Sequence, residues 1–493
     1  MSNEATTGTS VRSLKRTQVR VITVFFMIYI LVSGGSFGIE DMVSSSGPGL
    51  TLLLLVLLPV FWALPMALIA SELGSAIPGE GGFYVWARRG LGDFWGFQTA
   101  WWWSLSIFVD SAVYVVLAIQ YLQNWLHFSN LVGYLIAWAV IMVFAVMNIL
   151  GVKFVALSST AFAVLILLPF FALIVVGLVK WRFDPFTPVT APGVPFFGTG
   201  GVFALGLAIG VWMYSGYESM STLSGEIRNP QKVIPRALML VVPFIILMYV
   251  LPTLASLAAY GHWDTFATSA GDGYLSFVEI GKKIGGSALG YALLGSALLG
   301  NLALYLDYLA SGARPLFAIA RDGLFPRRIS RVSRWGTPAA AIVLMAVINA
   351  VLVVGPFQKL VVIDVILFIS AYVLIFISAV RLRVTEPDLK RPFRVPLGTG
   401  GMVAMVIPPI LIVIFTIYVN AIDRSTELFG ITGFRLFGQD VGWYGIAGFL
   451  ALFSGPVLFF LFRRIYGGPS TPSNEAGDEA IAIAETEAAE DAA

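Results

Sequence analysis

The stretch Ser33-Gly34-Gly35-Ser36-Phe37-Gly38-Ile39-Glu40 interrupts an apolar segment that runs from residue 20 to residue 46. Glycine and serine lower helix propensity and let the backbone leave the helical hydrogen-bond ladder, so the stretch predicts a break in a helix. Unwound backbone is tolerated at membrane depth only where it lines a cavity, and its free amides and carbonyls can bind a ligand there. A carboxylate, Glu40, follows the break directly.

A second interruption has the same form. Ser215-Gly216 breaks the apolar segment 199–225, and Glu218 follows it. A single glycine cluster is weak evidence, because small residues also serve close helix packing. The two breaks lie in the first and sixth apolar segments, which are corresponding members of two five-helix repeats. That placement is typical of a transporter built from inverted repeats, with two extra helices at its end.

The composition of the whole chain places it in a membrane. Of its 493 residues, 58% are hydrophobic and 12% are charged, whereas soluble domains carry about 25% charged residues. A spanning helix needs about 20 apolar residues. Twelve segments meet that need, and we expect an all-α membrane protein of twelve transmembrane helices with the first and sixth discontinuous. The segments are 20–46, 50–71, 94–122, 129–150, 154–179, 199–225, 234–260, 285–313, 337–357, 360–382, 401–422 and 442–462.

The positive charges predict the orientation. Sorted onto alternate sides of the twelve spans, 23 Lys and Arg residues fall on the side of both termini and seven on the other. The positive-inside rule makes the first side cytoplasmic. We expect a cytoplasmic tail over 1–19, a transporter domain over 20–465 and an acidic, disordered cytoplasmic tail over 466–493. Within the domain, the predicted repeats cover about 20–180 and 199–383, and the last two helices about 401–463.

An unpaired charge inside a predicted span is costly, and four carboxylates so placed are singled out: Glu40, Asp110, Glu218 and Asp307. The spans contain almost no cationic partner for them. One or two such acids could simply bond a neighbouring helix, but four together favour a solvated chamber that receives protons or organic cations. Asp307 and Ser311 lie one turn apart and suit a proton or sodium site; a mutual hydrogen bond between helices explains them equally well.

Aromatic residues accompany two of these acids. Trp103, Asp110 and Tyr114 share one face of the third span, and Trp212 and Tyr217 lie beside the sixth-span break. An aromatic ring beside a carboxylate suits an ammonium group through cation–π attraction and ion pairing. Because aromatic residues make up 14% of the chain, packing or an interfacial belt remains the alternative for any single ring.

Several motifs together resemble the amino acid, polyamine and organocation (APC) transporter superfamily. They are the first break, Gly216-Tyr217-Glu218 leading to Ser224-Gly225-Glu226-Ile227-Arg228-Asn229-Pro230, and Ala313-Arg314 leading to Ala320-Arg321-Asp322-Gly323-Leu324-Phe325-Pro326. The similarity covers roughly 20–465. Asp110 with Tyr114, and Arg391-Pro392-Phe393-Arg394-Val395-Pro396-Leu397-Gly398, are similar to the branch of polyamine and amino-acid proton symporters.

The resemblance implies a leucine-transporter-like (LeuT-like) fold of five plus five inverted helices, alternating access, and a substrate held between the first and sixth spans without ATP. By position, Ser33 to Gly35 would meet a carboxylate or another polar end of the substrate, and Tyr217 would act as a gate. Two positions depart from the pattern. The fifth span is apolar after Lys153, where some proton-coupled members carry a lysine, and Ile375 stands near where polyamine carriers tend to have an acid.

Other classes of protein fit less well. His127 and His262 fall in or near predicted outer loops, no metal-spaced cluster or Walker lysine motif is present, and neither a selectivity-filter loop nor repeated charged rings are visible. We therefore expect no enzyme, no metal site, no cofactor, no ATP and no nucleic-acid partner. The expected partners are a small-molecule substrate and the lipid bilayer of the cell (plasma or inner) membrane.

We predict a permease that takes up an amino acid or a polyamine by proton-coupled symport, with Na⁺ as the alternative coupling ion. Exchange of amino acids or amines and a channel-like facilitator are the alternative functions. The predicted substrate-binding residues are Ser33, Gly34, Gly35, Ser36, Glu40, Asp110, Tyr114, Trp212, Ser215, Gly216, Tyr217 and Glu218. The predicted coupling residues are Glu40, Asp110, Glu218, Asp307 and Ser311. A ligand can drive the access switch only through unequal affinity for the two states.

Overall fold

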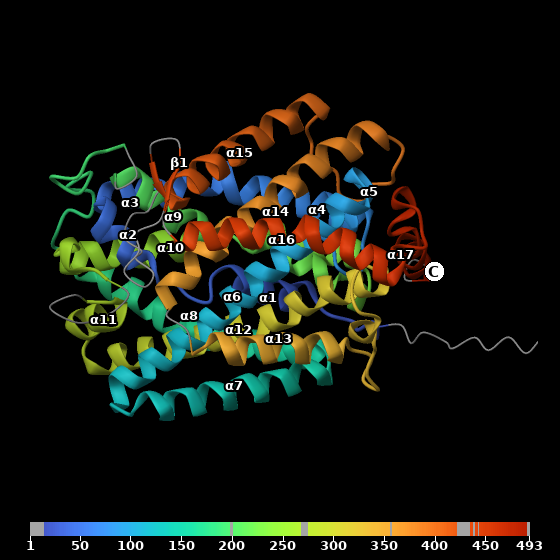
Figure 1. Ribbon diagram of the computed structural model, residues 1–493. Helices are drawn as coiled ribbons and strands as arrows, with labels where there is room; N and C mark the ends of the chain where they lie inside the picture. Colours follow the sequence, from blue (N-terminus) through green and yellow to red (C-terminus); the bar gives the residue numbers. More distant parts are fainter. Residues whose placement is uncertain are drawn as a thin grey trace, which may run out of the picture.

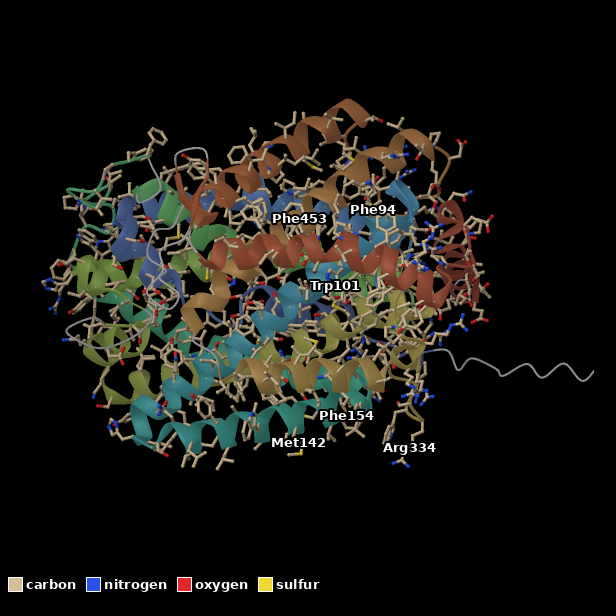
Figure 2. All side chains as sticks on the ribbon, in the orientation of Figure 1. Phe94, Trp101, Met142, Phe154, Arg334 and Phe453 are labelled. Carbon is tan, nitrogen blue, oxygen red and sulfur yellow. The ribbon has the colours of Figure 1, made fainter. Side chains whose placement is uncertain are left out.

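The computed structural model is a bundle of helices, most of which run along one common direction (Figure 1). It describes residues 14–197, 201–267, 275–354, 357–421, 434–436, 439–441 and 443–490, so residues 1–13 of the predicted N-terminal tail lie outside the described part. Apolar side chains cover the outside of the bundle. Met142 on α7 (Asn130–Leu150) and Phe154 on α8 (Val152–Val179), for example, lie at its periphery and are 65% and 54% exposed (Figure 2). This apolar exterior is what a lipid environment requires.

Within the described residues, nine helical segments are long and apolar enough to cross a membrane, so the chain is an integral membrane protein. One is the continuous helix α3 (Pro48–Leu58), η1 (Pro59–Ala63) and α4 (Leu64–Ala76). The others are α6 (Asp93–Leu126), α7 (Asn130–Leu150), α8 (Val152–Val179), α10 (Pro230–Tyr260), α12 (Ser287–Arg321), α14 (Phe357–Thr385), α15 (Thr399–Ala421) and α16 (Trp443–Tyr466).

Two shorter apolar helices, α1 (Val21–Val32) and α13 (Ala339–Leu352), add to this set. The count of twelve spans, the five-plus-five repeat and the boundaries of the predicted domains stay predictions.

The first predicted break is present. Helix α1 ends at Val32, a non-helical stretch follows, and α2 (Ile39–Ser46) resumes the helix. Three glycines make the break possible, because Gly34, Gly35 and Gly38 have φ values of 55°, 118° and 103°, which side chains with a Cβ atom rarely adopt.

The second break is also present and touches the first. Helix α9 (Val202–Met213) ends before Ser215-Gly216, and a 3-10 helix, η2 (Tyr217–Glu226), follows. Gly216 has a φ of 110°, and a Cβ atom at this position would lie 2.5 Å from the carbonyl oxygen of Leu31 in α1. Glycine is therefore required both by the backbone conformation and by the close approach of the two interrupted helices.

The remaining elements connect the long helices. They are α5 (Phe83–Leu91), α11 (Phe277–Gly285), the 3-10 turns η3 (Trp263–Thr265), η4 (Arg327–Ser330) and η5 (Ser473–Glu475), and a hairpin of β1 (Phe434–Leu436) and β2 (Gln439–Val441).

The C-terminal tail corrects one sequence prediction. Instead of a disordered segment, the structure has helix α17 (Asp478–Glu490), which lies at the same end of the bundle as the start of the described chain (Figure 1). Asp478 pairs with Arg89 at 2.5 Å and Glu487 with Arg16 at 2.8 Å. The composition of the tail alone favours a solvated chain, but the basic residues it meets come from distant parts of the sequence. We call the end of the bundle that α17 covers, where Arg16 and Arg89 lie, the basic end.

Candidate substrate site

A cavity of about 810 Å³ lies between the two helix breaks. Its wall combines the first break, the residues around Gly216, and faces of α6, α9, α12 and α14. Along α6 the lining runs from Trp103 to Tyr121, and Asp41 of α2 also contributes. Because α6 begins next to Arg88 at the basic end, the cavity extends toward the opposite end of the bundle.

Glu218, the acid after the second break, is surrounded by hydrogen-bond donors. The indole Nε1 of Trp103 donates to its Oε1 atom at 3.0 Å, and the hydroxyl of Tyr372 on α14 donates to its Oε2 atom. The amide of Gly216 in turn donates to the Tyr372 hydroxyl at 3.0 Å. This chain connects the break to α6 and α14, and it stabilises the carboxylate without a cationic partner.

Two further carboxylates face the cavity from neighbouring helices. Asp110 on α6 accepts a hydrogen bond from the Tyr114 hydroxyl at 3.1 Å, one turn along the same helix. Asp364 on α14 accepts one from Ser106, one turn before Asp110. The hydrogen bond from Ser106 thus places the carboxylate of Asp364 on α14 next to that of Asp110 on α6. Both acids are almost fully buried, at 6% and 2% exposure, yet both line the cavity.

Aromatic rings line the cavity together with these acids. Tyr114 stacks on Tyr308 of α12, with ring centroids 5.6 Å apart, and lies 6.5 Å from Trp212. Tyr308 donates its hydroxyl to the carbonyl of Leu31 at 2.9 Å, so its ring is fixed to the first helix. Among the described residues that line the cavity there is no lysine or arginine. The cavity is therefore acidic and aromatic, which suits an ammonium group.

Most of the predicted substrate residues meet at this cavity. The lining includes Ser33, Gly34, Asp110, Tyr114, Trp212, Ser215, Gly216 and Glu218. Their assignment to substrate binding stays a prediction, since geometry shows position and not occupancy.

Glu40 lies outside the cavity lining, although the sequence placed it in the site. Its two oxygens accept backbone amides, from Gly38 at 2.8 Å and from Phe277 at the start of α11 at 3.0 Å. The carboxylate is fully buried and ties the end of the first break to α11. Its geometry is that of a residue that positions the break.

Five other predicted residues also lie away from the lining: Asp307, which is described below, and Gly35, Ser36, Tyr217 and Ser311. Ser36 donates to the carbonyl of Met248 on α10 at 2.5 Å, and Ser311 approaches the carbonyl of Tyr308 at 3.4 Å. Gly35 packs against Phe37 and Phe170, and Tyr217 is buried at 1% exposure.

Sequence reasoning missed Asp364. It falls inside the predicted span 360–382 and meets the same criterion, an acid within an apolar segment, that singled out the other four. Ile375, where polyamine carriers tend to have an acid, is a buried apolar residue of α14. The acid of this helix is Asp364, which precedes Ile375 in the sequence. Tyr308 and Tyr372 were missed for a different reason, since a tyrosine within a span is uninformative until its hydroxyl partners are known.

Ion pairs close the bundle on the side of the basic end. Arg314 of α12 bonds Glu226 of η2 at 2.8 Å, and Arg383 of α14 bonds Glu72 of α4 at 2.5 Å. On the connecting helix α5, Tyr84 donates to Asp322 at 2.6 Å. Burial and this carboxylate raise the pKa of Tyr84 well above its ordinary value. The first ion pair thus joins α12 to η2 after the second break, and the second joins α14 to α4.

Comparison with known proteins agrees with this architecture. The model of the amino acid permease family matches residues 20–466. The chain belongs to the amino acid permease family. This confirms the resemblance to APC transporters that the sequence motifs indicated, and it identifies the permease as a membrane transporter of small molecules.

Curated relatives match most of this permease. Polyamine transporter PUT1 of Oryza sativa subsp. japonica is 34% identical over 425 residues, which cover 85% of the permease and 77% of the relative. Polyamine transporter RMV1 of Arabidopsis thaliana is 33% identical over 415 residues, 83% of each chain. An uncharacterized transporter of Legionella pneumophila is 27% identical over 362 residues, covering 69% of the permease and 76% of the relative.

Proposed function

We propose that this permease carries polyamines or related organic amines by proton-coupled symport. One observation supports the substrate class most directly: three buried carboxylates, Asp110, Glu218 and Asp364, share an aromatic cavity whose described lining contains no basic residue. Relatives that match 83–85% of the chain are polyamine transporters, which supports the same class.

The spacing of the acids over three elements favours a substrate with more than one positive charge. Asp110 and Asp364 lie near each other across α6 and α14, and Glu218 lies at the second break. Ionised carboxylates that are removed from water need a counter-charge or a proton. Protonated amine groups of one flexible molecule supply several counter-charges at once, and the rings of Tyr114, Tyr308 and Trp212 contact its methylene carbons and ammonium groups.

An amino acid is the second candidate substrate, because the helix breaks offer partners for a carboxylate. Ser33 and Gly34 line the cavity where the first helix is unwound. Backbone amides at such a break can bind a substrate's carboxylate while an acid such as Asp110 binds its ammonium group. The expected preference is still for amines, since an amino acid neutralises only part of the cavity's negative charge.

Transport proceeds by alternating access around the two breaks in a LeuT-like arrangement. The cavity lining extends away from the basic end, and ion pairs close the basic end itself. With the basic end in the cytoplasm, as the positive charges predict, this state faces outward. Both termini are then cytoplasmic. Cytoplasmic opening requires that the contacts between η2, α12 and α14 rearrange while the substrate remains bound.

Flux in proteoliposomes tests this function. Purified permease with an inwardly directed proton gradient is expected to accumulate radiolabelled spermidine, saturably, and to be inhibited by putrescine more than by neutral amino acids. Asp110→Asn and Asp364→Asn are expected to lower the apparent affinity about tenfold or more, because each removes a charge-assisted contact. Glu479→Gln on the exposed face of α17 is the control and is expected to behave as wild type.

The same assay separates the alternatives. Uptake that needs internal amine and ignores the proton gradient would indicate an exchanger. Uptake that does not saturate and never exceeds equilibrium would indicate a channel-like facilitator. Saturable uptake of neutral amino acids with no spermidine transport would overturn the amine assignment.

A further inference from the structure

A buried carboxylate outside the cavity faces a serine on another helix. Asp307 of α12 is 0% exposed and does not line the cavity. Its Oδ1 atom lies 2.5 Å from the hydroxyl of Ser159 on α8, and that hydroxyl also lies 2.7 Å from the carbonyl oxygen of Val155. Helices α8 and α12 pack against each other along this contact.

The hydrogens at this contact can be counted. A serine hydroxyl has one hydrogen, and donation to the carbonyl four residues earlier is its usual arrangement within a helix. If Ser159 donates to Val155, the 2.5 Å contact with Asp307 needs a second hydrogen. The carboxyl group of Asp307 is the group that can carry it, so that Asp307 donates to Ser159 and Ser159 donates to Val155.

The surroundings of Asp307 favour this neutral form. Among the described residues no side chain bonds its second oxygen, Oδ2, which is also buried. An ionised Asp307 would thus have one donor at most and no paired cation, at a high cost in a low-dielectric interior. Charged residues do occur on α12 and the elements packed against it, namely Asp93 and Asp110 on α6, Lys153 on α8, Glu218 and Glu226 in η2, Glu279, Lys282 and Lys283 on α11, Arg314 and Arg321 on α12, and Arg327 and Arg328 in η4. None of these bonds Asp307.

Asp307 stands on a helix that contacts both breaks. One turn before it, Leu304 packs against Gly34, where a Cβ atom would lie 2.4 Å from the leucine side chain. The next residue, Tyr308, donates its hydroxyl to Leu31 and lies against Gly216. If either break moves during the access switch, the turn of α12 that contains Asp307 therefore has to move or repack with it.

We propose that Asp307 is the site that binds the coupled proton, separate from the substrate cavity, with Ser159 as its hydrogen-bond acceptor. The coupling role rests on the proposed proton-driven transport, whereas the proton on Asp307 does not. In the present state the site is protonated and sealed. When the breaks rearrange, the contact with α8 opens and Asp307 loses its proton to the other side of the membrane.

Transport by the variant Asp307→Asn tests the coupling. Asparagine resembles the neutral acid and can donate to Ser159, so the variant is expected to fold and to exchange labelled spermidine across the membrane. A gradient of about one pH unit drives about tenfold accumulation per coupled proton with the membrane potential held at zero. The variant is expected to lose this accumulation and the accompanying proton influx. Wild-type accumulation by Asp307→Asn would overturn the proposal.

Ser296→Ala is the matched control. The Ser296 hydroxyl also bridges α12 to α8, through the carbonyl of Ile166 at 3.1 Å, but involves no carboxylate. This variant is expected to retain proton-driven accumulation. Equal loss of accumulation in Ser296→Ala and Asp307→Asn would show that helix packing and not a proton is responsible, and would overturn the assignment.

Infrared spectroscopy tests the proton without any substrate. Wild-type permease at neutral pH is expected to show the carbonyl stretch of a buried protonated carboxylic acid that is absent from Asp307→Asn and shifted in Ser159→Ala. Absence of such a band from the wild type would overturn the site even if spermidine is transported. A band with the expected behaviour in a protein that transports no amine would instead support the proton site and refute the proposed function.

Discussion

Two groups of buried carboxylates in this permease have opposite surroundings. At the basic end, Glu226 is bonded by Arg314 at 2.8 Å and Glu72 by Arg383 at 2.5 Å. In the cavity, the donors to Glu218 are an indole, a tyrosine and a serine, and no guanidinium of the described part of the chain bonds it. Both groups are equally hidden from the outside.

The difference separates acids that are paired within the protein from those proposed to bind the substrate. A buried carboxylate with an arginine is neutralised, and removing one partner leaves a costly charge behind. A buried carboxylate with neutral donors is oriented but still needs a positive charge or a proton. Burial alone therefore does not single out the carboxylates proposed to bind the substrate; they are buried, lack a protein cation and line the cavity.

The largest expected effect comes from breaking a pair at the basic end. Arg314→Met leaves Glu226 buried beside a hydrophobic side chain, which is expected to cost about 3–5 kcal/mol of unfolding free energy. Thermal unfolding followed by fluorescence-detected size exclusion measures the loss. The double variant Arg314→Met/Glu226→Gln is expected to regain most of the stability, and equal instability of the two would show that the charge left on Glu226 is not the cause.

Asp364→Asn sharpens the comparison from the cavity side. The variant removes a carboxylate that pairs with no protein cation, so its stability is expected to stay close to that of wild type or to increase. Its affinity for spermidine is expected to fall about tenfold or more, the loss of one charge-assisted contact. Equilibrium binding and thermal unfolding of the same preparation measure both quantities. A large loss of stability with unchanged affinity would move Asp364 into the structural group.

Glu40→Gln examines a carboxylate of an intermediate kind. Glu40 is not paired with an arginine, and it does not line the cavity. Because both of its oxygens accept backbone amides, the glutamine amide group must face one of those donors. We expect a loss of about 1–2 kcal/mol in stability. Its effect on spermidine affinity is expected to be smaller than that of Asp364→Asn. Should affinity fall more in Glu40→Gln, the acid would belong to the binding site after all.

The smallest effect is expected from an exposed pair between α17 and the connection from α14 to α15. Lys390 and Glu485 are 3.0 Å apart, with side chains 74% and 46% exposed. Lys390→Met is chemically matched to Arg314→Met but is expected to change stability by less than about 0.5 kcal/mol, because solvent screens the pair. High salt should then lower wild-type stability only slightly. A loss comparable to that of Arg314→Met would mean that exposure does not govern the strength of these pairs.

The sequence predicted the parts of the fold that depend on local chemistry. Gly34, Gly35 and Gly216 predict both breaks. Their positive φ values, and the close approach of neighbouring atoms to Gly34 and Gly216, are tolerated only by a residue without a Cβ atom. The apolar segments likewise predict helices that are long enough to span a membrane. The family motifs supported the same architecture without any knowledge of side-chain partners.

Partners across the structure could not be predicted in this way. Glu40 and Glu218 follow the breaks in the same manner, yet one accepts backbone amides from α11 and the other faces the cavity. The helix α17 forms where an acidic tail meets arginines that are hundreds of residues away in sequence. In each case the deciding interaction is long-range, and local composition carries no information about it.

The central claim, that Asp110, Glu218 and Asp364 bind the positive charges of the substrate, can be tested by titration calorimetry. Spermidine is added to the purified permease and, under the same conditions, to the triple amide variant Asp110→Asn/Glu218→Gln/Asp364→Asn. The account predicts saturable binding to the wild type and an affinity about a hundredfold or more lower in the variant, because three charge-assisted contacts are lost. Equal affinity of the two proteins for spermidine would contradict it.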